Sequence, residues 1–343
     1  MSRRVAWVGV WFGVFALAAA AALAPIPAAL VERWYSRTFF PPFQRAVTGA
    51  TNLVPFALFD VLWIGAIAAT AVMVRRRVRE HGWKLGLLRA AGALARGAAA
   101  VYLVFLATWG LNYRRVSMFE KVAFDQSRIT SASDTALGDW AARELNATYA
   151  AAHARAVSLE PLRAAFEGTL RALGGSPITP GRPKPTLLGW YFHETSIAGM
   201  TNPFLLETLV APDLLDVERP FVVAHEWAHL AGYADEAEAN FVAYLACRRG
   251  DSASRYSAAL AIIGYARPSG DIRQSLALGP RIDIFAINQR YAKTSGALRF
   301  AAKEGYDKYL KANRVERGIE SYDAVVQLIL GTAYDEQGNP ILK

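Results

Sequence analysis

Two histidines and a glutamate occur close together in the stretch HEWAH, as His225, Glu226 and His229. Residues four apart on a helix project from the same face, so both imidazoles can point at one metal ion. Glu226 lies beside that face and can reach a water held there. The spacing predicts a site for Zn2+ with His225 and His229 as ligands and Glu226 as the catalytic base. The alternative is a half-apolar helix with two ordinary core histidines.

A catalytic zinc needs a third protein ligand and an open coordination position. Asp235 would complete HExxHxxGxxD, a spacing akin to that of the metzincins, but those enzymes have a methionine turn downstream and every methionine here precedes His225. Glu236 is the better candidate because Asn240, four residues later, shares its helix face. Asn240 can accept a hydrogen bond from the far ring nitrogen of a ligand histidine. Glu238 points elsewhere and is expected to be a solvated or salt-bridged carboxylate.

The placement of Glu236 after HExxH resembles the pattern of the gluzincins. These are HExxH metallopeptidases whose third ligand is a glutamate on a following helix, with an aspartate four positions later. Asn240 departs from that pattern, and an amide orients a histidine less strongly than a carboxylate does.

A second resemblance covers most of the chain. Its motifs are WGLNYRR, IAGMTNPF, HEWAHLAGYADEAEANFVAYLAC and SYDAVV. These are similar to a bacterial family of membrane proteins, a domain of unknown function with three N-terminal spans and a zincin-like domain. The family pattern has glutamates at the positions of Glu236 and Glu238 and no acid at that of Asp235. The resemblance therefore implies Glu236 as the ligand.

Other residues are weaker candidates for the site. His193 could face the cleft or be a surface or capping histidine. Tyr322 and Tyr233 are the only nominations for stabilising an oxyanion. Substrate could pair with an edge strand, for which Ile197–Thr201 and Thr186–Phe192 are the candidates, although either could be a core strand.

The elements that must position these residues are mainly helical. Residues 133–173 have the spacing of two amphipathic helices. A helix is predicted from Arg219, with Pro220 in its first turn and Gly232 at its end, and a second one over Glu236–Arg249. The remainder to Leu330 is expected to be mostly helical, with a loop-like tail. The predicted class is mainly α. Three N-terminal transmembrane helices are followed by a zincin-like α+β domain with a small edge sheet and an HExxH active-site helix.

The membrane helices are predicted from composition. The chain is 53% hydrophobic, and three segments are apolar enough to cross a bilayer: Val5–Ala24, Leu53–Val74 and Gly97–Tyr113. Only Asp60 interrupts the second. A secretory signal over Met1–Ala24 is the alternative for the first, although Pro25 argues against cleavage.

Positive charge indicates the orientation. Nine of the basic residues lie at the N-terminus or between the second and third segments, and with Glu80 they supply +8 of the net charge of +9. By the positive-inside bias these parts are cytoplasmic, which places residues 114–343 outside. The remainder of the chain is nearly neutral, which excludes a nucleic-acid surface. The single cysteine, Cys247, excludes an intrachain disulfide.

The sequence thus predicts a membrane domain over residues 1–113 and an extracytoplasmic zincin-like domain over residues 114–343. The expected protein is a multi-pass zinc metallopeptidase of the bacterial cytoplasmic (inner) membrane, whose partners are the lipid bilayer and a peptide or protein substrate. The alternative is a non-catalytic membrane protein with a structural or vestigial metal site.

Overall fold

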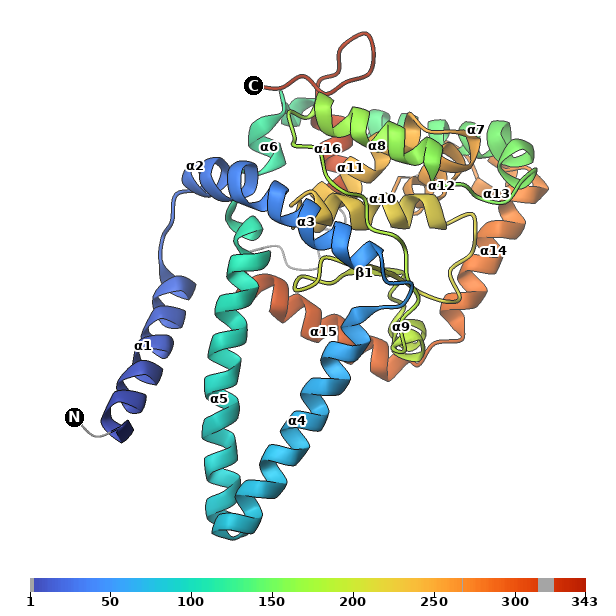
Figure 1. Cartoon of the computed structure of the whole chain (residues 1–343). Helices are drawn as coiled ribbons and strands as arrows, with labels where there is room; N and C mark the ends of the chain where they lie inside the picture. Colours follow the sequence, from blue (N-terminus) through green and yellow to red (C-terminus); the bar gives the residue numbers. More distant parts are fainter. Residues whose placement is uncertain (1–2, 267, 314–323) are drawn as a thin grey trace.

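The structure, a computed structural model, describes residues 3–266, 268–313 and 324–343. These residues are mainly helical, and the described part of the chain contains one sheet, of two strands. A helical domain stands on a long hairpin formed by α4 and α5, with α1 beside it (Figure 1). This agrees with the predicted mainly α class with a small sheet.

The hairpin helices α4 (Leu58–His81) and α5 (Trp83–Thr108) have 24 and 26 residues. At about 1.5 Å per residue, each exceeds the roughly 30 Å of a hydrocarbon layer. In the apolar stretch of 18 residues within α4, only 6% of residues are buried within the protein. A third span results if α1 (Arg3–Leu23) is counted with the helices after it, to which it lies at 109°. Two or three helices can therefore span a membrane.

The limits of the spans differ from the prediction. Both hairpin helices continue through the arginine-rich segment, so the long connection expected there is a turn at Gly82, whose φ of +76° suits glycine. The segment between the first two predicted spans is helical. It forms α2 (Ala28–Leu30), the π-helical η1 (Val31–Phe39) and α3 (Phe40–Asn52). Tyr35 anchors it to α5 by donating to the carbonyl of Ala107.

The domain is built around α11 (Glu236–Arg248), whose residues from Glu236 to Cys247 are all buried. Its neighbours α10 (Arg219–Leu230), α8 (Glu160–Ala172) and α12 (Ser252–Ile263) pack against it. The same core includes Leu106 and Trp109 from the end of α5. Packing is therefore continuous between the hairpin and the domain.

The remaining described elements are η2 (Gly110–Arg114), α6 (Met118–Lys121), η3 (Gln126–Arg128), α7 (Ser131–His153), α13 (Ile272–Ser275), α14 (Leu278–Ala292), α15 (Gly296–Ala312) and α16 (Ala324–Gly331).

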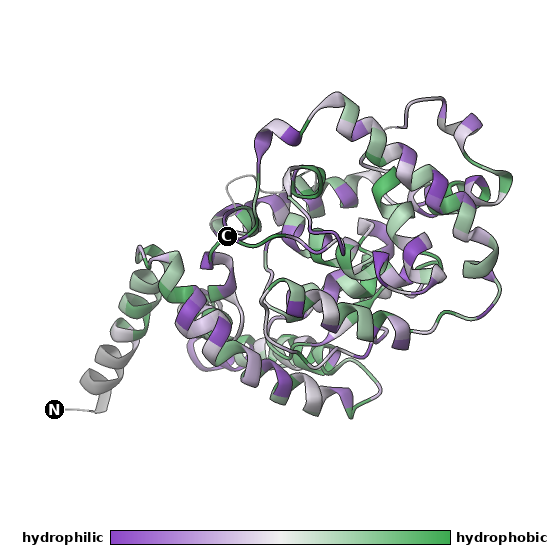
Figure 2. Ribbon diagram, turned by 90° about the horizontal axis from the view of Figure 1, so that it is seen from above, coloured by the Kyte–Doolittle hydropathy of each residue, from purple (hydrophilic) through white to green (hydrophobic). Residues whose placement is uncertain are grey.

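Several predicted elements are confirmed. The region 133–173 contains α7 and α8, as expected, and α10 and α11 occupy the predicted ranges to within a residue. Gly232 has φ of +83° and follows α10. Seen from above, α1 stands apart from the domain, over whose helices hydrophilic and hydrophobic residues alternate (Figure 2).

The sheet pairs β1 (Gly199–Thr201) with β2 (Thr208–Val210) in antiparallel register, with Met200 opposite Leu209. The strand predicted over Thr186–Phe192 is wrong, because a turn at Leu187 and Leu188 leads into helix α9 (Gly189–Thr195), which takes up the rest of the segment.

A contact distant in sequence accounts for that turn. The carboxylate of Asp60, in the first turn of α4, accepts hydrogen bonds from Thr186 Oγ1 at 2.7 Å and from the Leu187 amide at 2.9 Å. These bonds take the place of those a strand partner would make. Asp60 is buried and also accepts from the indole of Trp63, so its carboxylate joins the second span to the domain.

Candidate metal centre

The connection between α10 and α11 is short, and it places the start of one helix beside the end of the other. The amide of Tyr233 donates to the carbonyl of Ala228, which closes the last turn of α10 around the left-handed Gly232. Asp235 then caps α11 by accepting from the amides of Ala237 and Glu238. Asp235 therefore has a local structural task, and Glu236 is the first helical residue that faces α10.

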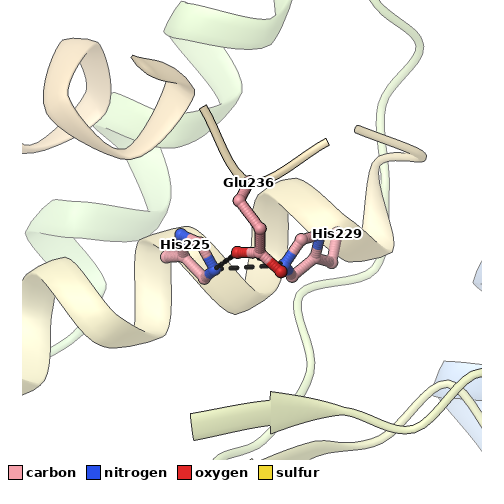
Figure 3. Close-up of side chains that lie close together, drawn as sticks. All are labelled: His225, His229 and Glu236. Atoms are coloured by element: carbon pink, nitrogen blue, oxygen red, sulfur yellow. Dashed lines mark hydrogen bonds and ion pairs between the residues drawn. The ribbon is translucent and has the colours of Figure 1, made fainter. Parts of the chain in front are cut away.

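Three ligand-type side chains converge at this connection. His225 Nε2 lies 3.0 Å from His229 Nε2, and Glu236 Oε2 lies 3.1 Å and 3.6 Å from the same two nitrogens (Figure 3). One ligand atom from each residue lies within 4.8 Å of the others. His225, His229 and Glu236 form a group that could hold a metal ion.

The outer nitrogens of both rings have oxygen partners. His225 Nδ1 lies 2.8 Å from Asn240 Oδ1, and His229 Nδ1 lies 2.7 Å from the carbonyl oxygen of Tyr233. Both oxygens only accept, so each Nδ1 carries a proton. In the neutral imidazole each Nε2 then presents a lone pair toward the point where the three side chains meet, as metal ligation requires.

The group is buried and strongly coupled. The side chains of His225, His229 and Glu236 are 14%, 9% and 3% exposed. Burial alone would raise the pKa of Glu236, but the adjacent imidazoles hold it well below its usual value. Burial alone would lower the pKa of His229, yet the adjacent negative charge of Glu236 raises it to about 9. Among the described residues, Glu236 Oε2 is buried without a hydrogen-bond partner, as expected of an oxygen that binds a cation.

Glu226 lies on α10 beneath β1. It is buried, and burial raises the pKa of its carboxyl above the usual value. Thr201 Oγ1, on β1, lies 2.8 Å from Glu226 Oε2 and 2.9 Å from its backbone carbonyl oxygen. A Cβ on Gly199 would lie 2.7 Å from Glu226 Oε1 and 2.9 Å from Val222 Cγ1. Glycine therefore lets β1 pass close over the carboxylate.

Four residues that bond to the ligand group, to Glu226 or to the turn after α10 escaped the sequence analysis as site residues. The Tyr306 hydroxyl on α15 hydrogen-bonds to Glu236 Oε1, and no motif surrounds it. Thr201 holds Glu226 from β1. Trp109 Nε1 donates to the carbonyl of His229 at 3.2 Å, and Arg115 Nη1 donates to that of Gly232 at 2.9 Å. Trp109 and Arg115 belong to WGLNYRR, a motif singled out only for its family resemblance.

The remaining candidates lie outside the group of three ligands. Glu238 was predicted to be solvated or salt-bridged, but it is buried and, among the described residues, forms no ion pair. Its carboxylate accepts from the amide of Met118 at 2.6 Å. His193 Nδ1 pairs with Asp213 Oδ2 at 2.7 Å. The ring of Tyr233 is buried and packs beneath Arg115. Tyr322 lies outside the described residues.

Comparison with known proteins gives one match. Residues 35–330 match the model of a family described as "Protein of unknown function (DUF3810)". The match includes both hairpin helices and the whole metal-ligand group. No curated protein and no solved structure shows significant similarity to the chain.

Proposed function

The chain belongs to the DUF3810 family, and we propose that it is a membrane-anchored zinc hydrolase, specifically a metallopeptidase of gluzincin type. The observation that carries the proposal is the spacing of the three ligand atoms. Zinc bonded to nitrogen and oxygen at about 2.0–2.1 Å in a tetrahedron sets its ligands about 3.3 Å apart. The separations of 3.0, 3.1 and 3.6 Å between the atoms of His225, His229 and Glu236 lie around that value.

The donor set also supports zinc. Two imidazole nitrogens and one carboxylate oxygen, with one position left for water, are typical of catalytic zinc, whereas structural sites are usually closed by four protein ligands that include cysteine. Cys247, the only cysteine, lies seven residues beyond Asn240 on α11 and is not in the group.

The chemistry proposed for the site is hydrolysis of a peptide bond. Zinc held by His225, His229 and Glu236 would lower the pKa of a water toward about 7 and polarise the substrate carbonyl. Glu226 accepts the proton of that water and passes it to the leaving nitrogen. Its pKa, raised above the ordinary value by burial, suits a group that must both take and return a proton. Thr201 holds one oxygen of the carboxylate in place.

The strand β1 is the proposed binding edge for substrate. It carries Thr201 and Gly199, both beside Glu226, and among the described residues it pairs on one side only, with β2. An extended peptide added to its other edge would have its backbone fixed by main-chain hydrogen bonds next to the base.

We further propose that the domain lies outside the cytoplasmic membrane. The arginines from Arg75 to Arg79 lie near the Gly82 turn, at the end of the hairpin away from the domain (Figure 1). Basic residues at that end favour a cytoplasmic turn, which puts the domain on the opposite side. The residues from 114 onward, with the helices of residues 28–52 that bond to them, would then lie on the extracytoplasmic side, and the spans within residues 1–113 would form the membrane part.

A peptide-library digestion tests the proposal. The full chain, purified in detergent and loaded with zinc, is expected to cleave peptides, and Glu226→Gln to lose activity about 10²- to 10⁴-fold while keeping its metal. Glu336→Gln makes the same change on an exposed residue and should be fully active. Full activity of Glu226→Gln with zinc bound would refute the role of the base.

One observation favours the second candidate, a structural metal site without catalysis. The three ligand side chains are nearly closed off, and Tyr306 covers Glu236 from α15. A site closed in this way leaves no coordination position for water or an inhibitor. Binding of a hydroxamate to the zinc-loaded chain, measured by calorimetry, separates the two functions, because only an open metal accepts it.

A further inference from the structure

Three large apolar side chains are exposed on the part of the domain that adjoins the hairpin. Leu187, Trp190 and Phe300 are 72%, 70% and 70% exposed. Leu187 precedes α9, Trp190 lies on α9, and Phe300 lies in the N-terminal half of α15. We call these three residues the α9–α15 face.

The elements of this face are adjacent to one another and to the hairpin. The Ser295 amide, at the start of α15, donates to Glu194 Oε2 on α9 at 2.8 Å. The Leu187 amide donates to Asp60 Oδ2 in the first turn of α4. In Figure 1, α9 and the nearby end of α15 are level with the first turns of α4. The α9–α15 face therefore lies where the second span begins.

The apolar surface continues onto α4 itself. Phe56, just before the helix, and Val61, in its first turns, are 53% and 59% exposed. Beyond them, almost none of the apolar 18-residue stretch of α4 is buried within the protein. A surface that is continuous with a lipid-facing helix meets the same surroundings as that helix.

We infer that the α9–α15 face inserts into the interfacial layer of the phospholipid bilayer that holds α4 and α5. Tryptophan is enriched at this depth because its ring is apolar and its N–H is polar, so Trp190 suits the position. Arg299 and Lys303, one residue before and three residues after Phe300 on α15, are exposed and can reach lipid phosphates. The domain thus rests on the bilayer instead of standing above it.

This contact places the lipid close to the metal-ligand group. The helix α15 carries Phe300 at one end and, further along, Tyr306, whose hydroxyl hydrogen-bonds to Glu236. One helix therefore joins the bilayer surface to the candidate ligand. The inference depends on neither bound metal nor hydrolysis, so it stands or falls separately from the proposed function.

A matched control is available on α14. Leu278 is 68% exposed, close to the values for Trp190 and Phe300. The residue before it, Ala277, is tied to α7 by its hydrogen bond to Asn146, far from the hairpin in Figure 1. A bilayer that receives the α9–α15 face leaves Leu278 in water.

The test uses single reporter cysteines in the full chain. Cys247 is fully buried, so Trp190→Cys, Phe300→Cys and Leu278→Cys can each carry an environment-sensitive fluorophore. In phospholipid vesicles, the labels at 190 and 300 are expected to emit at shorter wavelength, to be quenched by lipids brominated on the acyl chain, and to be shielded from iodide. The label at 278 is expected to show the reverse.

Two results would overturn the inference. In the first, the labels at 190 and 300 are as accessible to iodide as the label at 278. In the second, they are shielded only at high protein density and become accessible on dilution with lipid, which would assign the face to contact with a second copy of the chain.

Discussion

The indole of Trp109, at the end of α5, donates a hydrogen bond to the carbonyl oxygen of His229 on α10. Six residues later, Arg115 donates to the carbonyl of Gly232 in the turn after that helix. The end of the third predicted span is thus bonded directly to the backbone that carries a candidate metal ligand. The position of His229 depends on the hairpin as well as on the domain.

Replacing Trp109 by phenylalanine tests this link. Trp109→Phe removes the donor but keeps an aromatic ring, and the His229 carbonyl retains its bond from the Gly232 amide. We expect the free energy of unfolding to fall by about 1 kcal/mol. The zinc affinity, measured by competition with a chromophoric chelator, should fall by less than about tenfold. Trp190→Phe, on an exposed indole, is the control. Unchanged affinity in Trp109→Phe would show that the bond does not position His229.

Thr201 is expected to set the proton affinity of the base. Its hydrogen bond lowers the pKa of Glu226, against the larger raising effect of burial. Thr201→Val therefore raises that pKa further and should move the acid limb of the kcat/KM profile to higher pH. Thr201→Ser keeps the hydroxyl and should restore the wild-type profile. A profile of Thr201→Val that overlays the wild type would contradict the assignment of Glu226 as base.

Asn240 is expected to govern metal affinity through His225. Asn240→Leu removes the acceptor of the His225 Nδ1 proton and should weaken zinc binding about 10- to 100-fold. Asn240→Asp should bind zinc more tightly than wild type, because a carboxylate orients the ring more strongly. It also removes the buried amide nitrogen Nδ2, which has no partner. Equal affinities for the three proteins would contradict the proposed role.

Zinc and protons are expected to compete at His229. Its folded-state pKa of about 9 lies above the ordinary value of 6.5, so in the chelator-treated protein this residue contributes stability below pH 6.5 that is lost as pH rises through 9. Zinc requires the neutral imidazole, so zinc affinity should increase over the same interval. The increase in melting temperature on adding zinc should therefore grow from pH 6.5 to 9. An increment independent of pH would contradict this competition.

Much of the candidate metal centre was predictable because its signals are local. These signals all lie within one helix–turn–helix segment: His225 four residues before His229, the turn at Gly232, and Glu236 four residues before Asn240. The helix and turn are as predicted, and the three ligand side chains are brought together.

The errors arise where distant residues decide the structure. Thr186–Phe192 has the composition of a strand, but Asp60 on α4 bonds to its first residues and a helix follows. Glu238 looks solvent-facing by its position on α11, yet it is buried and accepts a hydrogen bond from the Met118 amide. Tyr306 reaches Glu236 from 70 residues away in sequence. Local pattern contains no information on such contacts.

The membrane helices show the limit of hydropathy. Apolar length identified α4 and α5, but their ends were misplaced because the helical hydrogen-bond pattern continues through the arginines to Gly82. The helices of residues 28–52 were missed because their polar residues, among them the buried Gln44 and Thr48, bond to the domain.

The zinc content of the purified full chain tests the central claim most directly. After equilibration with zinc and removal of the excess, elemental analysis is expected to find one zinc per chain in the wild type and in Glu336→Gln. The double variant His225→Ala/His229→Ala and the variant Glu236→Ala should each lose it while retaining the wild-type helical circular dichroism. Wild-type protein without zinc, or a folded double variant that still holds one equivalent, would contradict the assignment.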